Sequence, residues 1–515
     1  MNASRFLLLG ILCVGGSGIF TPWCAAQISE LPQEPKPTSE PTSESTSEST
    51  PKSTSEPTSE PAFPAEERPN ILFIMSDDHA SHAISAYGSR VNQTPHIDRL
   101  AEEGILFRNC FCTNSLCGPS RAVIMTGKHS HINGFIDNKS RFDSAQPTVA
   151  KTLHAAGYET VMLGKWHLVS EPTGFDYWNI LPGQGVYFDP TFIEMGRRVP
   201  QRGYVTDIIT DMAIDYLEHR WDRSKPFFMM CHHKAPHRSW LPHPKWDRVP
   251  DEPIAVPESF FDDGSGRGRP AMEQKLSCAK DLKPFDLKRD PPEGLDEREM
   301  AIWKYQRYMN DYLRCVASVD ESVGRILDWL DSTGLAENTA VFYCGDNGFF
   351  LGDHGWFDKR FMYEESLRMP LLIRWPKGIR AGIVNSDLVQ NLDFAETFLD
   401  IAGVAIPTDM QGRTLRPLFQ GDTPDDWRTS IYYHYYEFPD EHYTYPHYGV
   451  RTLTDKLMFF PTLDPKEPQN GWEYYDLTKD PEEYTNTVRD PANSQRVAEL
   501  KKELERLRTL YGDTE

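Results

Sequence analysis

The chain has 515 residues, of which 39% are hydrophobic and 25% are charged, so it can bury a large core and is not disordered overall. Its formal net charge of −22 argues against nucleic-acid binding, because phosphate recognition depends on clustered lysine and arginine. An anionic ligand would therefore need a local cationic pocket.

The N-terminal residues predict an export signal. Arg5 precedes an apolar run over residues 6–20 and the small residues Ala25 and Ala26, a pattern typical of a secretory signal peptide at 1–26. The alternative is an uncleaved membrane anchor, but the run is short for a span, and no later segment is apolar enough to cross a bilayer. We expect an exported protein, periplasmic or extracellular if it is bacterial.

Residues 27–67 predict a disordered linker. Between residues 35 and 61 the units PTSE and STSE repeat with almost no apolar side chains. Such a segment cannot bury enough surface to offset the entropy of ordering it. The linker could be a spacer or a tolerated insertion, and the folded part is expected to begin near Arg68.

An alternation of strand and helix patterns follows. Residues 70–76 are a continuous apolar run ending in Asp-Asp-His, as expected for a strand buried on both faces of a parallel sheet. Further strands are predicted at 105–111, 159–166, 225–233, 339–344 and 370–376, and helices at 94–104, 147–158, 204–220 and 298–329. The alternation predicts an α/β domain over residues 68–425 whose ligands bind beyond the carboxyl ends of the strands.

The C-terminal part has a different pattern. Short, aromatic-rich segments at 428–438, 447–460 and 471–477 are typical of antiparallel strands, and residues 494–512 form an amphipathic helical pattern. We expect a smaller α+β subdomain over residues 426–515.

Four oxygen-bearing side chains follow two predicted strands. Asp77 and Asp78 come after the first strand, and Asp346 and Asn347 come after the strand at 339–344. Each pair alone is more typical of a helix cap or a turn. Together they favour a calcium or magnesium site, because these cations prefer oxygen ligands.

The segment CGPSR, from Cys117 to Arg121, stands between a predicted strand and the amphipathic run SRAVIMTG. Taken alone, CxPxR is short enough to occur by chance, with the cysteine as a buried small residue before a helix. Its position here places Cys117 near a helix N-terminus, which favours anions. Ser120 is interpreted as part of the motif's structure rather than as a nucleophile.

Several motifs follow one another between residues 69 and 376: PNILFIMSDDH, CGPSRAVIMTGKH, GKWHL, APH, GDNG and the lysine of WFDKR. In this order they resemble the motifs of the formylglycine-dependent sulfatase family, within the alkaline phosphatase-like superfamily. The segment YYDLTKDPEE resembles the family's C-terminal subdomain. The resemblance implies a large mixed, mostly parallel sheet flanked by helices, with a smaller C-terminal α+β subdomain.

The resemblance also implies that Cys117 is oxidised to formylglycine by a maturation enzyme that reads Pro119 and Arg121. A serine would leave a sulfate ester that water cleaves slowly, whereas an aldehyde hydrate keeps a second hydroxyl whose deprotonation expels sulfate. Seven cysteines follow the signal peptide, so six would remain to pair or to stay buried.

By the same resemblance, four oxygen-bearing residues hold calcium together with the modified Cys117. These are Asp77, Asp78, Asp346 and Asn347. Arg121 would orient the nucleophile. The positively charged side chains of the site would attract an anion although the net charge of the chain is negative.

The remaining roles are carried over in the same way. Lys165 and His167 would bind the sulfate oxygens, while His237 and Lys359 would face the ester oxygen, one of them protonating the leaving group. His237 follows Ala-Pro as in the family, but His232, His233 or His243 could serve instead. His354 could support the metal site.

These residues predict a sulfuric-ester hydrolase that releases sulfate from a sulfated carbohydrate. Residues 358–376 resemble N-acetylglucosamine-6-sulfatase-like enzymes, and the aromatic-rich residues 432–449 could stack on sugars, although such clusters more often form a core. The alternatives are a phosphate mono- or diester hydrolase of the same superfamily and a catalytically inactive, displayed binding protein.

Overall fold

The structure is a computed structural model that describes residues 68–248, 253–462 and 471–514. The predicted signal peptide (1–26) and linker (27–67) lie outside the described residues. Within the described ranges, no helix combines the length and apolar character needed for a membrane crossing.

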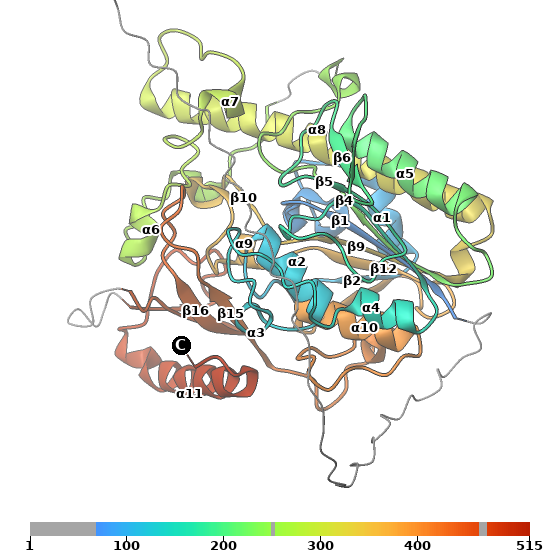
Figure 1. The fold of residues 1–515 in the computed structure, drawn as a ribbon. Helices are drawn as coiled ribbons and strands as arrows, with labels where there is room; N and C mark the ends of the chain where they lie inside the picture. Colours follow the sequence, from blue (N-terminus) through green and yellow to red (C-terminus); the bar gives the residue numbers. More distant parts are fainter. Residues whose placement is uncertain (1–67, 249–252, 463–470, 515) are drawn as a thin grey trace, which may run out of the picture. The chain divides into compact units, whose positions relative to one another are not determined.

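A ten-stranded mixed sheet organises the large core (Figure 1), in the order β13-β2-β12-β9-β1-β8-β4-β5-β6-β7. Adjacent strands from β9 to β5 run parallel, whereas β12 is antiparallel to β9 and to β2. The strands are β1 (Asn70–Ser76), β2 (Ile105–Phe107), β4 (Glu159–Lys165), β5 (Tyr177–Leu181), β6 (Thr191–Glu194), β7 (Arg197–Pro200), β8 (Phe227–His232), β9 (Thr339–Gly345), β12 (Leu371–Arg374) and β13 (Ile383–Asn385). The predicted mostly parallel α/β sheet is confirmed.

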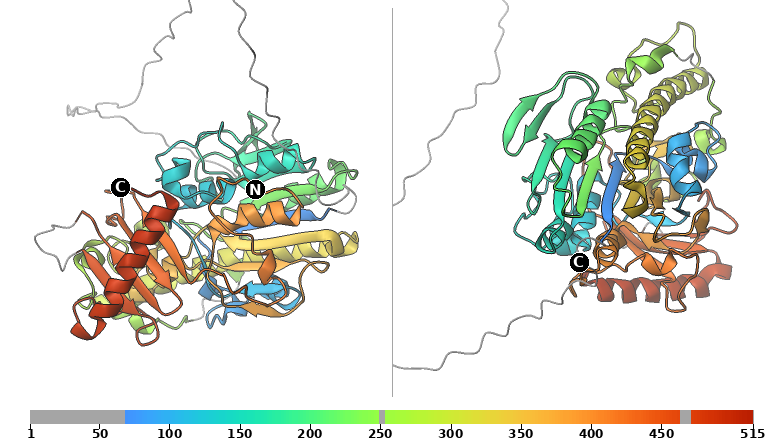
Figure 2. Two further views of the ribbon diagram at one scale, coloured as in Figure 1. Left: turned by 90° about the horizontal axis from the view of Figure 1, so that it is seen from below. Right: turned by 90° about the vertical axis from the view of Figure 1, so that its right-hand side faces the viewer.

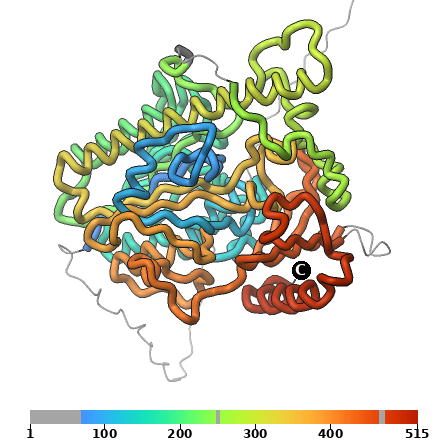
Figure 3. The backbone as a smooth tube through the Cα atoms, turned by 180° about the vertical axis from the view of Figure 1, so that it is seen from behind, coloured from blue at the N-terminus to red at the C-terminus, as the bar shows by residue number. Residues whose placement is uncertain are grey.

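Helices cover both faces of this sheet, which explains the continuous apolar character of β1. Ile71, Phe73 and Met75 pack with helices on one face, and Leu72 and Ile74 pack on the other. The first set of helices is α2 (Cys117–Thr126), α4 (Val149–Ala155) and α10 (Phe394–Ile401); the second is α1 (Pro95–Glu102), α5 (Val205–His219) and α8 (Glu297–Ser332). Figure 3 shows α8, in yellow, running beside α5, in green.

The C-terminal strands form a separate antiparallel sheet in the order β15-β16-β17-β18, covered by helix α11 (Figure 2). Val497, Leu500, Leu504 and Leu507 repeat at three- and four-residue spacing and are buried against this sheet. The elements are β15 (Ser430–Tyr435), β16 (His447–Thr452), β17 (Asp455–Phe459), β18 (Trp472–Asp476) and α11 (Ser494–Tyr511). The predicted C-terminal sheet and terminal helix are confirmed.

The aromatic residues of β15 belong to the cores of the protein. Tyr432, Tyr433 and Tyr435 are fully buried. Their rings therefore have no free face for a sugar, and the suggestion that the aromatic-rich segment stacks on sugars is wrong for these three residues.

The strand predicted at 105–111 is interrupted. Arg108 and Asn109 form a turn between β2 and β3 (Cys110–Phe111), and β3 pairs with β14 (Val389–Gln390) instead of the large sheet. The antiparallel pair β6 and β7, at one end of the strand order, was not predicted from the sequence. The remaining short elements are α3 (Ser130–Asn133), α6 (Arg269–Glu273), α7 (Pro284–Leu287), α9 (Glu364–Leu367), β10 (Phe350–Leu351) and β11 (Phe357–Asp358).

The cysteines of the described ranges do not pair with one another. All of them are buried and free: Cys110, Cys112, Cys117, Cys231, Cys278, Cys315 and Cys344. Of the two outcomes left open by the sequence, burial is the one the structure shows.

Candidate functional site

Most of the predicted site residues lie at the carboxyl ends of four strands. β4, β8, β1 and β9 are adjacent and parallel, so these ends meet at one edge of the sheet. The residues there are Lys165 at the end of β4, His232 at the end of β8, Asp77 and Asp78 after β1, and Asp346 and Asn347 after β9. Residues distant in the sequence are thereby brought to one place.

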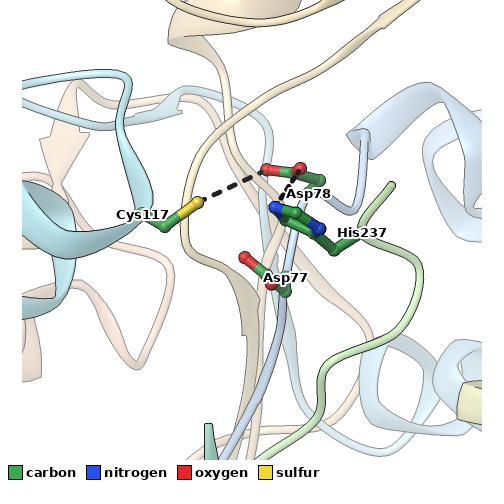
Figure 4. A group of neighbouring side chains, drawn as sticks. All are labelled: Asp77, Asp78, Cys117 and His237. Carbon is green, nitrogen blue, oxygen red and sulfur yellow. Dashed lines mark hydrogen bonds and ion pairs between the residues drawn. The ribbon is translucent and has the colours of Figure 1, made fainter. Parts of the chain in front are cut away.

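One group of side chains at this edge is close enough to hold a metal ion. Potential ligand atoms of Asp77, Asp78, Cys117 and His237 all lie within 4.8 Å of one another (Figure 4). Asp77 Oδ1, Asp78 Oδ2 and Asn347 Oδ1 are buried and have no hydrogen-bond partner among the described residues. Buried oxygens normally have a partner, and hard cations take oxygen ligands, so these atoms fit calcium.

Asp346 joins the same cluster through hydrogen bonds. Its Oδ1 accepts from the backbone N–H of Asp78 at 3.0 Å, and its Oδ2 accepts from Arg121. Asn347 Nδ2 donates to Asp78 Oδ1 at 3.0 Å, which leaves Asn347 Oδ1 as the free acceptor. Burial, followed by the charge of Asp77, raises the pKa of Asp346 to about 7.

Cys117 is the first residue of α2 and is almost fully buried. Its Sγ lies 4.0 Å from Asp78 Oδ1 and 3.3 Å from Lys359 Nζ. Burial, followed by the charge of Asp77, raises the pKa of the Cys117 thiol well above its ordinary value, so an unmodified thiol here would be a weak nucleophile. A Cβ on the next residue, Gly118, would lie 2.5 Å from Cε1 of Phe135, so this motif position accommodates only glycine without movement of the ring.

Arg121, in α2, connects this helix to the carboxyl ends of β4 and β9. Its Nε and Nη2 donate to Asp346 Oδ2 at 3.1 and 3.0 Å, and its Nη1 donates to the carbonyl of Lys165 at 2.6 Å. Ser120 Oγ donates to the backbone carbonyl of Asp346 and accepts from Asn391 Nδ2 at 2.8 Å. Ser120 therefore has the structural position that the sequence predicted for it.

Two buried lysines neutralise two of the carboxylates. Lys165 Nζ donates to Asp77 Oδ2, and Lys359 Nζ donates to Asp78 Oδ1. Burial alone would raise the pKa of Asp77, but Lys165 and the neighbouring cations hold it well below its ordinary value. Burial raises the pKa of Asp78 despite Lys359. Although burial opposes it, the carboxylate of Asp78 holds the pKa of Lys359 well above its ordinary value.

The two predicted catalytic histidines are half-buried, and their surroundings favour the neutral imidazole. His237 Nε2 lies 3.9 Å from Asp78 Oδ2, and His167 Nδ1 has no hydrogen-bond partner in the described part of the chain. Burial, reinforced by the positive charge of Lys165, lowers the pKa of both imidazoles well below the ordinary value. A neutral imidazole can accept a proton or bind an oxygen through its N–H.

The alternative histidines do not belong to this metal-ligand group, although His232 lies at the same edge of the sheet. His232 Nδ1 lies 3.2 Å from the Lys165 carbonyl, and His233 Nε2 lies 3.1 Å from Ser322 Oγ. His243 is partly exposed and lies 3.4 Å from a carboxylate oxygen of Asp207. The structure therefore brings His237, and not these three, into the metal-ligand group.

His354 lies outside this group. Its Nδ1 is 2.6 Å from Arg267 Nη1 and 3.2 Å from Asp262 Oδ2, and its ring contacts Trp356 and Tyr363. These neighbours are not ligands of the predicted metal site. A metal-supporting role for His354 has no support in these contacts.

Sequence reasoning missed two polar residues near the site. Gln184, in the loop after β5, accepts a hydrogen bond from Lys165 Nζ, and Lys234 is buried between β8 and His237. The loop has no periodic pattern that could have marked Gln184. Lys234 stands directly before the Ala-Pro-His motif, and that position was the available signal.

A mixed α/β sheet that gathers buried cations and unpartnered carboxylate oxygens at one edge defines a hydrolase site for an anionic ester. The sulfatase family model matches residues 69–404, and the model described as "N-sulphoglucosamine sulphohydrolase, C-terminal" matches residues 352–510. The chain belongs to the sulfatase family, within the alkaline phosphatase-like superfamily, and is a sulfuric-ester hydrolase. The resemblance stated from the motifs is confirmed, and so is the prediction of a sulfuric-ester hydrolase.

Individual relatives agree with this assignment. The chain is 47% identical over 496 residues to an N-acetylglucosamine-6-O-sulfatase of Bacteroides thetaiotaomicron, covering 87% of this chain and 88% of that protein. It is 26% identical over 477 residues to the N-acetylglucosamine-6-sulfatase of Homo sapiens, covering 82% and 81%. A solved structure in complex with its substrate, D-glucosamine-2-N,6-O-disulfate, matches with a TM-score of 0.83 and 46% identity, over 87% of this chain and 99% of that one.

Proposed function

We propose that this sulfatase removes the 6-O-sulfate from a glucosamine-type sugar of a sulfated glycan. The observation that carries the proposal is the 47% identity, along 87% of the chain, to an N-acetylglucosamine-6-O-sulfatase. The similar structure that holds D-glucosamine-2-N,6-O-disulfate supports the same substrate class.

The proposed nucleophile derives from Cys117, converted to formylglycine by a maturation enzyme. In that form the side chain supplies a hydrated aldehyde in place of a thiol. Support comes from the position of Cys117 at the start of α2 and from the unsuitability of its buried thiol. Arg121 holds Asp346 and the end of β4 in place next to this residue.

The proposed cofactor is calcium, held by oxygens of four side chains together with the modified Cys117. The ligands are Asp77, Asp78, Asp346 and Asn347. The unpartnered oxygens of Asp77, Asp78 and Asn347 support this set. When bound, the ion would supply positive charge for the sulfate oxygens.

The remaining charged residues would handle the sulfate and the leaving group. Lys165 and His167 would bind sulfate oxygens, while His237 and Lys359 would face the ester oxygen, one of them protonating the departing sugar. The side chain of His237 is 15% exposed, whereas those of Lys165 and Lys359 are buried, which supports a site approached from the His237 side.

We also propose export of the chain through the signal peptide at 1–26 and display of the catalytic domain beyond the linker at 27–67. The repeated PTSE and STSE units and the apolar N-terminal run support this proposal.

A panel of monosulfated sugars tests the proposed function. Protein produced with a formylglycine-generating enzyme should release inorganic sulfate from N-acetylglucosamine-6-sulfate much faster than from its 3-sulfate or from N-acetylgalactosamine-6-sulfate. The Cys117→Ala variant, produced in parallel, is the control for contaminating activity. Preference for another sulfate position or another sugar would overturn the substrate assignment.

A further inference from the structure

Lys234 is a buried lysine at the site that none of the proposed roles uses. It is 4% exposed, and its Nζ makes no hydrogen bond to any residue in the described ranges. The ammonium lies 5.0 Å from the centroid of the Tyr187 ring. The nitrogen itself is not fully enclosed, so its three donors can reach water or a bound ligand.

The backbone places Lys234 beside the metal-binding strand end. The N–H of His233 donates to the carbonyl of Met75 at 2.8 Å, and the N–H of Asp77 donates to the carbonyl of Ala235 at 3.3 Å. Residues 233–235 therefore continue alongside the end of β1. Lys234 lies between these two contacts, next to Asp77.

A turn over residues 234–237 brings Lys234 and His237 to the same side of the site. The N–H of His237 donates to the carbonyl of Lys234 at 3.1 Å, and Tyr187 Oη donates to the carbonyl of His237 at 2.5 Å. The Tyr187 ring therefore contacts the ammonium of Lys234 while its hydroxyl holds the turn.

Within the described residues, the ammonium of Lys234 forms no ion pair with a carboxylate. Lys165 and Lys359 each donate to an aspartate, whereas Lys234 lies over the π face of Tyr187. Burial, followed by repulsion from Lys165, lowers the pKa of Lys234 to about 8, and Asp77 and Asp78 oppose this effect. The ammonium is thus within electrostatic reach of the metal-ligand group.

We propose that Lys234 binds an oxygen of the ester sulfate, as a substrate-binding residue in addition to Lys165. The inference rests on the proposed function and deepens it. The burial of Lys234 beside Asp77 points to the sulfate, which must reach the strand edge, and not to a second anion of the sugar. Gln184, by contrast, is exposed although its side chain reaches Lys165, so it marks the outer rim of the site.

The variant Lys234→Met tests this role. We expect KM to rise about tenfold to a hundredfold for both N-acetylglucosamine-6-sulfate and a small aryl sulfate, because a hydrogen bond to a charged group is lost in each case. The inhibition constant of inorganic sulfate should rise by a similar factor. Lys234→Arg should recover part of the loss.

A matched control is Lys304→Met, which removes a partly buried lysine whose one hydrogen bond within the described part of the chain goes to the carbonyl of Ala279. It should leave KM and inhibition by sulfate unchanged. An effect of Lys234→Met confined to disulfated sugars would overturn the proposal in favour of a second anion. Unchanged KM and unchanged sulfate inhibition would overturn it in favour of a purely structural lysine.

A measurement on the unaltered enzyme covers the case in which Lys234→Met does not fold. A crystal structure with bound inorganic sulfate should place a sulfate oxygen about 2.7–3.2 Å from Lys234 Nζ. A separation beyond about 4 Å would overturn the proposal. The aryl sulfate and free sulfate do not depend on the sugar, so these tests remain valid if the enzyme prefers another sulfated glycan.

Discussion

Replacing Arg121 by lysine tests how the site is held together. Arginine donates at this position to Asp346 Oδ2 through two nitrogens and to the carbonyl of Lys165 through a third. Lysine keeps the charge but has one nitrogen, so it can replace about one of these contacts. The variant therefore isolates the geometry of the guanidinium from its charge.

The expected magnitude follows from the lost hydrogen bonds. Each hydrogen bond to a charged group contributes about 1.5–3 kcal/mol, so losing two costs about 3–6 kcal/mol before relaxation. We expect the free energy of unfolding of Arg121→Lys to fall by about 3 kcal/mol. We also expect kcat/KM to fall by at least about a hundredfold, because α2, which carries Cys117, is no longer held in a fixed position relative to the Asp346 carboxylate.

Urea denaturation and sulfate release from a sulfated sugar measure the two effects. Arg428→Lys is the matched control, because Arg428 is only 10% exposed and donates to both carboxylate oxygens of Asp393, away from the ends of β1 and β9. It should lower stability with little change in kcat/KM. Equal loss of activity in both variants, or full activity in Arg121→Lys, would refute the reasoning.

Three further predictions concern the histidine, the metal and pH. His237→Gln should lower kcat by about 10²–10⁴-fold, whereas His243→Gln should stay near wild type in the same sulfate-release assay; equal losses would contradict the assignment. Chelation should abolish activity and calcium should restore it, and unchanged turnover after exhaustive chelation would exclude the metal role. Burial raises the pKa of Glu396 from 4.5 to about 8, so the folded state keeps a proton that the unfolded state releases. The free energy of unfolding should therefore fall between about pH 4.5 and 8, by at most about 1.4 kcal/mol per pH unit from this group, and Glu396→Gln should lose that slope. The same pH slope in both proteins would contradict this explanation.

The central strands and the residues at their ends were predictable from the sequence. Residues 70–76 and 339–344 are uninterrupted apolar runs, and each ends in polar side chains, so both the buried strand and its functional end are visible. Cys117 could be placed at a helix start because Pro119 and the amphipathic run after it indicate one.

Other features depend on contacts that local sequence does not encode. The strand predicted at 105–111 divides because residues 110–111 pair with β14, which is more than 270 positions further along the chain. Gln184 and Lys234 reach the site through a loop and a turn without periodicity, so only the folded chain places them beside Lys165 and Asp77.

The most direct test of the central claim compares activity with the chemical state of Cys117. Preparations made with different amounts of maturation enzyme should contain different fractions of formylglycine, measured by mass spectrometry of the peptide that contains this residue. Sulfate release per molecule should rise in proportion to that fraction and extrapolate to zero where the thiol is intact. Full activity in protein whose Cys117 remains a thiol would contradict the account.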